Sequence, residues 1–164
     1  KGNKMITIIV AADQDLLIGK AGTRNGMPWD NKEDLAHFKK TTLNHTVLFG
    51  MNTFKAMGMR ALPKRHTILI THQDYQNDKV EVRHDFDEVI QEYKNKQEDL
   101  FICGGAGIYK QALPVADTLL LSRIPGKHEG ETYFPDFKEY GYTLVETTPY
   151  ETFTLETYRR GATC

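Results

Sequence analysis

The stretch DLFICGGAGIYKQAL, residues 99–113, decides the fold class of this chain. Its first five residues, 99–103, form an almost wholly apolar run, which predicts a strand buried on both faces of a sheet. The glycines that follow lead directly into a helical segment. A buried strand that passes through a glycine turn into a helix is typical of parallel sheets covered by helices, because parallel strands need crossover connections.

The same alternation of strand and helix extends in both directions from this stretch. The predicted strands are 5–12, 46–50, 66–71, 80–83 and 99–103, and the predicted helices are 31–43, 52–58, 85–94 and 104–113. Asp85 is expected to cap the third of these helices. After residue 116 we expect no helix, and the predicted strands are 117–124, 142–147 and 151–159, the last two forming a hairpin. The chain therefore predicts a single α/β domain over residues 1–164. It has one mixed, mainly parallel sheet flanked by helices and a C-terminal antiparallel hairpin.

The bulk composition excludes several classes of partner. The net charge of −1 and the pI near 6.7 give no basic surface for nucleic acid or acidic lipid. No apolar run is long enough to cross a bilayer, and the N-terminal residues lack a signal-peptide pattern, so we expect a cytoplasmic protein. Cys103 and Cys164 are too few for a disulfide scaffold, and the six histidines show no metal-ligand spacing.

Glycines follow the ends of several predicted strands. Ligands of open α/β sheets bind beyond the carboxyl ends of the strands, where Gly19, Gly50, Gly104 and Gly105 are expected. Glycines between a strand and a helix let backbone N–H groups approach phosphates. The segment GGAGIY, residues 104–109, is not the usual dinucleotide fingerprint, so a tight structural turn remains an open alternative.

The predicted helix 31–43 carries an acid beside its apolar face. Asp30 or Asn31 is expected to cap this helix, and Asp34 borders the face that Leu35 and Phe38 share with Thr42. An inward carboxylate loses hydration and needs a partner, which a cationic or N–H-rich ligand could supply. The alternative is an acid that only interacts favourably with the helix dipole.

The loop before this helix, residues 16–29, contains three glycines and the chain's single tryptophan, Trp29. A bulky aromatic side chain on such a loop suits a lid that excludes water from a hydride transfer. A loop anchored by one buried tryptophan is the compatible alternative.

Together these segments resemble the dihydrofolate reductase family. The resemblance covers nearly the whole chain and depends on the order of its motifs: LLIG, MPW, a helix with D-L-x-x-F, TVLFGMNTF, LPKRHTILIT, CGGAGIY and EGETYFPDF. It implies an enzyme that reduces 7,8-dihydrofolate with hydride from NADPH, supplies one-carbon metabolism and binds antifolate inhibitors. It also implies a monomer with an adenosine-binding subdomain at about 45–97.

The resemblance assigns roles to individual residues. Asp34 matches the carboxylate that binds the pterin ring, and Trp29 matches a tryptophan that helps to place a water near it. Arg65 matches the arginine that binds the substrate's glutamate tail, and Ser122 matches a hydroxyl that supports the carboxylate. The other implied substrate contacts are Ile9, Val10, Ala11, Leu35, Phe38, Met57, Cys103 and Tyr109.

The implied cofactor site lies at the strand ends. Its Gly104–Gly105 pair matches one that is joined by a cis peptide in this family. Thr71 and His72 align where the adenosine 2′-phosphate is bound. The implied contacts are Ala11, Ile18, Gly19, Gly50, Met51, Asn52, Thr53, Thr71, His72, Cys103, Gly104, Gly105, Ala106, Gly107, Ile108 and Tyr109.

The chain departs from the family pattern at three places. Met51 stands where the family often has an arginine, which removes a cation from the implied phosphate site; His72 can replace it when protonated. The loop between Gly19 and Met27 is longer than in many members. Asn31-Lys32 replaces the Leu-Pro that usually follows the tryptophan.

Two other functions remain open at this stage. One is an NADPH-dependent reductase of a ribosylated aminopyrimidine in flavin synthesis, built on the same scaffold. The other is a non-catalytic nucleotide-binding module, which would leave Asp34 and Arg65 without a role.

Overall fold

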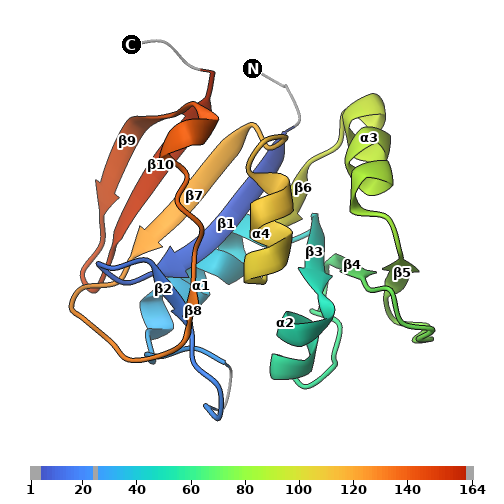
Figure 1. Cartoon of the computed structure of the whole chain (residues 1–164), viewed down its shortest axis with the longest axis horizontal. Coiled ribbons are helices and arrows are strands. Elements are labelled where there is room, and N and C mark those ends of the chain that lie inside the picture. Colours follow the sequence, from blue (N-terminus) through green and yellow to red (C-terminus); the bar gives the residue numbers. More distant parts are fainter. Residues whose placement is uncertain (1–4, 24–25, 162–164) are drawn as a thin grey trace.

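The computed structural model describes residues 5–23 and 26–161. Within these ranges the strands are β1 (Ile6–Ala12), β2 (Leu17–Gly19), β3 (Thr46–Gly50), β4 (His66–Ile70), β5 (Glu81–Arg83), β6 (Leu100–Ile102), β7 (Thr118–Arg123), β8 (Thr132–Tyr133), β9 (Tyr142–Pro149) and β10 (Thr154–Arg160). The helices are α1 (Lys32–Thr42), α2 (Met51–Ala56), α3 (Phe86–Lys96), α4 (Ala106–Ala112) and the 3₁₀ helix η1 (Lys138–Tyr140). Figure 1 shows this arrangement.

Eight of the described strands form one sheet in the order β5-β4-β3-β6-β1-β7-β10-β9, and β2 and β8 form a separate two-stranded sheet. The strands from β5 to β7 pair in parallel, whereas β10 pairs antiparallel with both β7 and β9. The predicted mixed sheet with a C-terminal hairpin at its edge is therefore confirmed (Figure 1). In a parallel sheet the carboxyl ends of neighbouring strands meet at one edge, and this edge positions the site described below.

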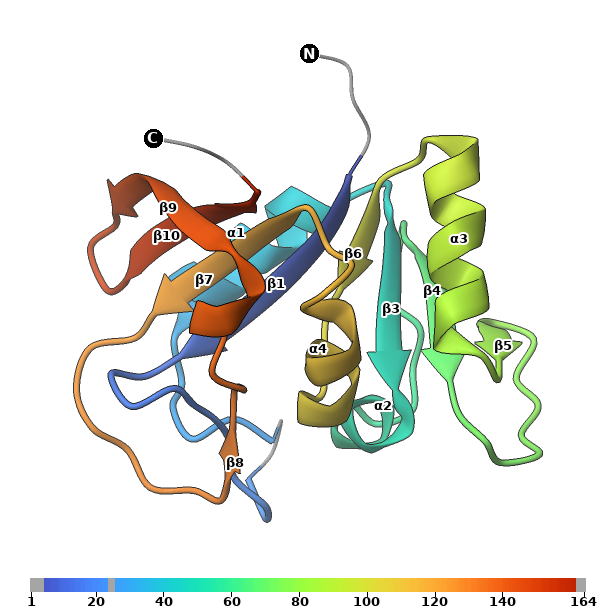
Figure 2. The same ribbon diagram turned by 45° about the horizontal axis from the view of Figure 1, so that its top comes forward.

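Helices cover both faces of the sheet because alternate residues of each strand point to opposite sides. On β1, Ile6 and Ile8 belong to a buried cluster that includes α3 and α4, whereas Ile9 belongs to a second cluster that includes Phe38 of α1. Figures 1 and 2 show α1 on the opposite side of the sheet from α3 and α4. The apolar runs of the sequence thus correspond to strands buried on both sides.

The helix starts follow the predicted capping residues. Asn31 caps α1 by accepting a hydrogen bond from the Asp34 N–H at 2.9 Å. Asp85 caps α3 by accepting from the Glu88 N–H at 3.2 Å. Each cap satisfies one of the N–H groups that a helix start leaves without an internal partner.

Three local predictions were wrong. Residues 16–29 are not entirely loop, because β2 pairs antiparallel with β8, more than 110 residues away in the chain. Helix α2 ends before the predicted residue 58, because Gly58 and Met59 have positive φ angles, which interrupt a right-handed helix. The 3₁₀ helix η1 lies beyond residue 116, where no helix was expected.

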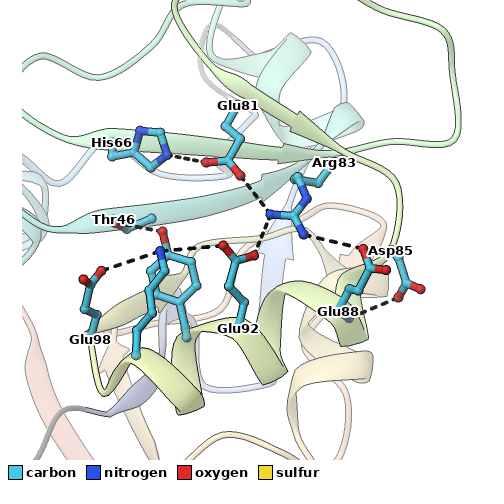
Figure 3. A network of polar contacts seen from close by, with 10 residues as sticks. Thr46, His66, Glu81, Arg83, Asp85, Glu88, Glu92 and Glu98 are labelled. Atoms are coloured by element: carbon cyan, nitrogen blue, oxygen red, sulfur yellow. Dashed lines mark hydrogen bonds and ion pairs between the residues drawn. The ribbon is translucent and has the colours of Figure 1, made fainter.

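A network of ion pairs joins the β5 edge of the sheet to α3 (Figure 3). Arg83 of β5 bonds to Glu81 at 2.9 Å and to Glu92 of α3 at 2.8 Å, and Glu81 also bonds to His66 of β4. These bonds to Glu92 and Glu81 raise the pKa of the Arg83 guanidinium. Because the groups are partly exposed, we expect the network to orient the edge more than to stabilise it.

No helix among residues 5–23 and 26–161 is long and apolar enough to span a membrane. Cys164 lies outside the described residues.

Burial predicts different stability effects for two leucines on different strands. Leu48 of β3 is fully buried, and Leu48→Ala should lower the free energy of unfolding by about 2–5 kcal/mol through lost burial and a cavity. Leu144 of β9 is 46% exposed, and Leu144→Ala should change the free energy of unfolding by less than about 0.5 kcal/mol. Urea denaturation measures both; equal losses would contradict the described core.

Candidate active site

Asp34 lies in the first turn of α1 and is only 8% exposed. Burial raises the pKa of its carboxyl, while a hydrogen bond from the Ser122 hydroxyl on β7 and the nearby His37 ring act in the opposite direction. No lysine or arginine of the described chain forms an ion pair with this carboxylate. A buried carboxylate with only a neutral hydroxyl donor keeps acceptor capacity for an N–H-bearing ligand.

The apolar surface on this side of the sheet supplies walls for a flat ligand. Phe38, Met57 and Cys103 pack around a buried cluster that contains Ile9. Leu35, predicted to line the site, is 40% exposed on the same helix as Asp34. Val10 was predicted here as well, but its side chain packs in the cluster on the opposite face of the sheet.

The Arg65 guanidinium is held beside α1 by three hydrogen bonds. Its Nε donates to Thr42 Oγ1 at 2.8 Å, and its two terminal nitrogens donate to the carbonyl oxygens of Pro63 and Lys39, each at 2.6 Å. Since a guanidinium carries five N–H groups, two remain for a ligand. A preorganised guanidinium with free donors can bind a carboxylate in two-pronged geometry.

The C-terminal hairpin is fastened to the helix that carries Asp34. Thr152, in the turn between β9 and β10, donates to Glu33 Oε1 through both its N–H at 2.8 Å and its hydroxyl at 2.6 Å. Asn31 in turn donates to the Thr152 carbonyl oxygen at 3.2 Å. Sequence reasoning missed these contacts, and the hairpin thereby fixes the first turn of α1.

Three glycines form a narrow cradle where β3 and β6 end. The Gly50 N–H donates to the Gly104 carbonyl oxygen at 2.8 Å, and the Gly104–Gly105 peptide is cis, as the family resemblance predicted. A Cβ on Gly105 would lie 2.8 Å from Thr53 Oγ1, and one on Gly50 would lie 3.0 Å from Ile108. A Cβ at either position would force Thr53 or Ile108 to shift, and both α2 and α4 begin here without a side-chain cap. Their first N–H groups are therefore available to an anionic ligand.

The other predicted cofactor residues occupy the same edge or its extension. Thr71 is buried just after β4, and its hydroxyl accepts from the Gln73 N–H, whereas His72 is exposed. The Tyr109 hydroxyl donates to the Ile9 carbonyl oxygen at 2.9 Å and so ties α4 to β1. The remaining predicted contacts lie in β1 and β2 or in the first turns of α2 and α4: Ala11, Ile18, Gly19, Met51, Asn52, Ala106 and Gly107.

Trp29 lies in the segment just before α1. It packs with Ala11 against a buried cluster that contains Phe153, and its indole N–H is buried without an acceptor among the described residues. The preceding loop is attached to the β7–β8 segment, because Glu131 accepts from the Ala21 N–H at 2.7 Å. Sequence reasoning missed Glu131, because its partner is 110 residues away.

His37 is another neighbour that sequence reasoning missed. It lies on α1 one turn after Asp34, and burial lowers the pKa of its ring. The helical spacing from Asp34 could have indicated it. No group of three possible metal ligands occurs in the part of the chain that the structure describes.

A family model described as dihydrofolate reductase matches residues 5–160. The chain belongs to the dihydrofolate reductase family. Curated dihydrofolate reductases of Mycoplasma genitalium and Lactococcus lactis are each 36% identical to it, over 95% of this chain and 98% of their own length. A solved structure of the Enterococcus faecalis dihydrofolate reductase, complexed with NADP(H) and RAB-propyl, matches with a TM-score of 0.88 and 34% identity. This match covers 96% of this chain and 97% of that one.

Two adjacent acids of this reductase-family chain should affect stability in opposite directions. Because burial raises the pKa of Asp34, the folded chain holds that proton more tightly than the unfolded chain, and stability falls as pH rises toward the raised value. Asp34→Asn should therefore raise the Tm at pH 7, and the gain should shrink as the pH falls toward about 4.

Glu33→Gln is the matched control. Hydrogen bonds from the Thr152 side chain and backbone lower the pKa of Glu33, so its contribution to stability is present at neutral pH and is lost on acidification. This variant should lower the Tm at pH 7. Thermal unfolding followed by circular dichroism measures both, and a lower Tm for Asp34→Asn would contradict the described burial.

Proposed function

We propose that this chain reduces 7,8-dihydrofolate to 5,6,7,8-tetrahydrofolate with hydride from NADPH. The observation that carries the proposal is the buried Asp34 carboxylate, supported by Ser122 and lying in no ion pair with a described lysine or arginine. The site supports reduction of dihydrofolate rather than a passive nucleotide-binding role, because a nucleotide site alone would need neither this acid nor the preorganised Arg65.

Asp34 would bind the pterin ring through its N3–H and 2-amino group. The two oxygens of a carboxylate match two parallel N–H donors, and low hydration strengthens both bonds. Phe38 and Met57 would pack against the ring and the benzoyl group, and the two remaining N–H groups of Arg65 would bind the glutamate α-carboxylate. The substrate would thus be held at both ends.

The glycine cradle would hold the cofactor. The residues fit a dinucleotide because Gly50, Gly104 and Gly105 leave room that a Cβ would fill, beside two helix starts with free N–H groups. Bound NADPH would supply the hydride. Thr71 and His72 would bind the adenosine phosphate, and a protonated His72 would offset the cation that Met51 does not provide.

The remaining step is protonation of the pterin N5. Asp34 would bond the edge of the ring that lies away from N5, so it would not deliver the proton directly. A water held near the Trp29 indole is the proposed donor, and Asp34 would increase the basicity of the ring. The Trp29 loop would exclude bulk water during the transfer.

Several features of the protein as a whole belong to the same proposal. We expect a cytoplasmic monomer that binds antifolate inhibitors and no nucleic acid. Within it, residues 45–97 would form the adenosine-binding subdomain, whose outer edge is held by the Arg83 network.

Asp34→Asn should abolish most of the activity. Loss of the carboxylate removes both recognition of the N–H pair and the effect on ring basicity, so kcat/KM should fall by roughly 10²–10⁴-fold. The loss of absorbance at 340 nm after adding dihydrofolate, first with NADPH and then with NADH, measures this activity. Asp30 is an exposed acid nearby, and the control variant Asp30→Asn should retain activity. Near-normal turnover in Asp34→Asn would show that the proposed role of Asp34 is wrong.

Gly105→Ala should weaken NADPH binding. Its Cβ would meet Thr53 Oγ1 at 2.8 Å and push the cradle apart, which should raise the Kd by about tenfold or more, or ~1.4 kcal/mol. Gly107→Ala places its Cβ where no atom lies within 4 Å and should lose much less affinity. Fluorescence titration with NADPH compares them, and equal Kd values would count against the proposed cradle.

A further inference from the structure

Three segments that are distant in sequence meet around the imidazole ring of His128. This residue lies in the segment between β7 and β8, Asp13 follows β1, and Trp29 precedes α1. The His128 ring lies edge-on to the Trp29 ring, with centroids 5.2 Å apart and planes at 64°. Its Nδ1 lies 3.3 Å from Asp13 Oδ2.

Asp13 is a fully buried anchor for this arrangement. Its Oδ1 accepts from the N–H groups of Asp15 at 2.9 Å and Leu17 at 3.0 Å, and its Oδ2 accepts from the His128 N–H at 2.9 Å and from the His128 ring. Burial acts to raise the pKa of the carboxyl, but the hydrogen-bond donors outweigh it and lower the pKa. Asp13 is therefore a fixed anion that joins the β1–β2 turn to the segment carrying His128.

The contact with Asp13 determines where His128 can gain a proton. A carboxylate only accepts, so Nδ1 must carry the proton in the neutral ring, and a second proton would go to Nε2. Protonation would then place a full positive charge on a ring that touches Trp29, without breaking the bond to Asp13.

The position of Trp29 depends on packing. Its indole N–H has no acceptor among the described residues, so its orientation is set by His128 and by the cluster of Ile124, Phe153 and Leu155. We propose that His128 is a positioning residue for Trp29, and that its protonation changes how Trp29 is held over the site. This inference rests on the proposed function for its catalytic meaning, but not for its test.

The experiment must distinguish the effect of His128 on Trp29 from the effects of other titratable groups near these two residues. Lys127 and Glu129 flank it in the sequence, and Asp30 follows Trp29. On α1, Asp34 and His37 lie nearby, and the His37 ring is 5.8 Å from that of Phe153, which packs in the same cluster as Trp29. His37 is therefore the ionisable group whose protonation could most easily be mistaken for that of His128.

Because Trp29 is the only tryptophan, its fluorescence reports the cluster directly. An imidazolium quenches a neighbouring indole, so emission of the unliganded chain should fall in a single transition when the His128 ring gains its second proton. His128→Asn keeps an N–H donor for Asp13 but cannot titrate, and it should abolish this transition. His37→Phe and His66→Asn should retain it, and the pH profile of kcat should lose the same ionisation in His128→Asn alone.

The outcomes separate the inference from the proposed function. A flat titration of the unsubstituted chain, or a transition that persists in His128→Asn, would overturn the role of His128 whatever the reductase activity. A normal transition without dihydrofolate reduction would overturn the function instead. If His128→Asn does not fold, the unsubstituted chain can be labelled at its histidines and followed by NMR as the pH changes. The inference requires that the His128 ring signal and the Trp29 emission change at the same pH, and different midpoints would overturn it.

Discussion

The site depends on keeping the Asp34 carboxylate away from water without giving it a cation from the protein. A buried acid of this kind costs stability, because its charged form has lost hydration and gains only the Ser122 hydroxyl and the influence of His37 in return. The surrounding structure must therefore be held firmly enough that α1 does not turn the acid toward solvent. The Asn31 cap and the bonds between Thr152 and Glu33 provide that restraint.

The parallel arrangement of β1, β3, β4 and β6 places the rest of the site within reach of this acid. Their carboxyl ends meet along one edge, where the glycine cradle opens at the starts of α2 and α4. The antiparallel end of the sheet, formed by β9 and β10, contacts the helix that carries Asp34. Its hairpin turn is hydrogen-bonded to α1 through Thr152 and Glu33.

Local physical rules predicted much of this architecture from sequence. Apolar runs indicated the buried strands, and Asn31 and Asp85 were among the predicted helix caps. For Asp34, the helix pattern alone left open whether the acid faces inward or only interacts with the helix dipole. The family resemblance, rather than any local pattern, indicated the roles of Arg65 and Ser122 and the cis peptide at Gly104–Gly105.

Several features that escaped prediction depend on contacts between distant segments. β2 exists because β8 pairs with it, and Glu131 reaches Ala21 across 110 residues of sequence. The contact between His128 and Asp13 spans 115 residues. Nothing in the residues near either partner indicates such pairs, since each depends on the packing of the whole sheet.

The bonds between Thr152 and α1 also bear on how the molecule matures during synthesis. A ribosome releases α1 long before it has made β9 and β10, so a nascent chain has no brace for the helix turn that carries Asp34. Under the proposed function, substrate recognition by Asp34 would be deferred until translation is almost complete. A partly made chain would carry the acid and the glycine cradle but could not yet hold them in their working arrangement.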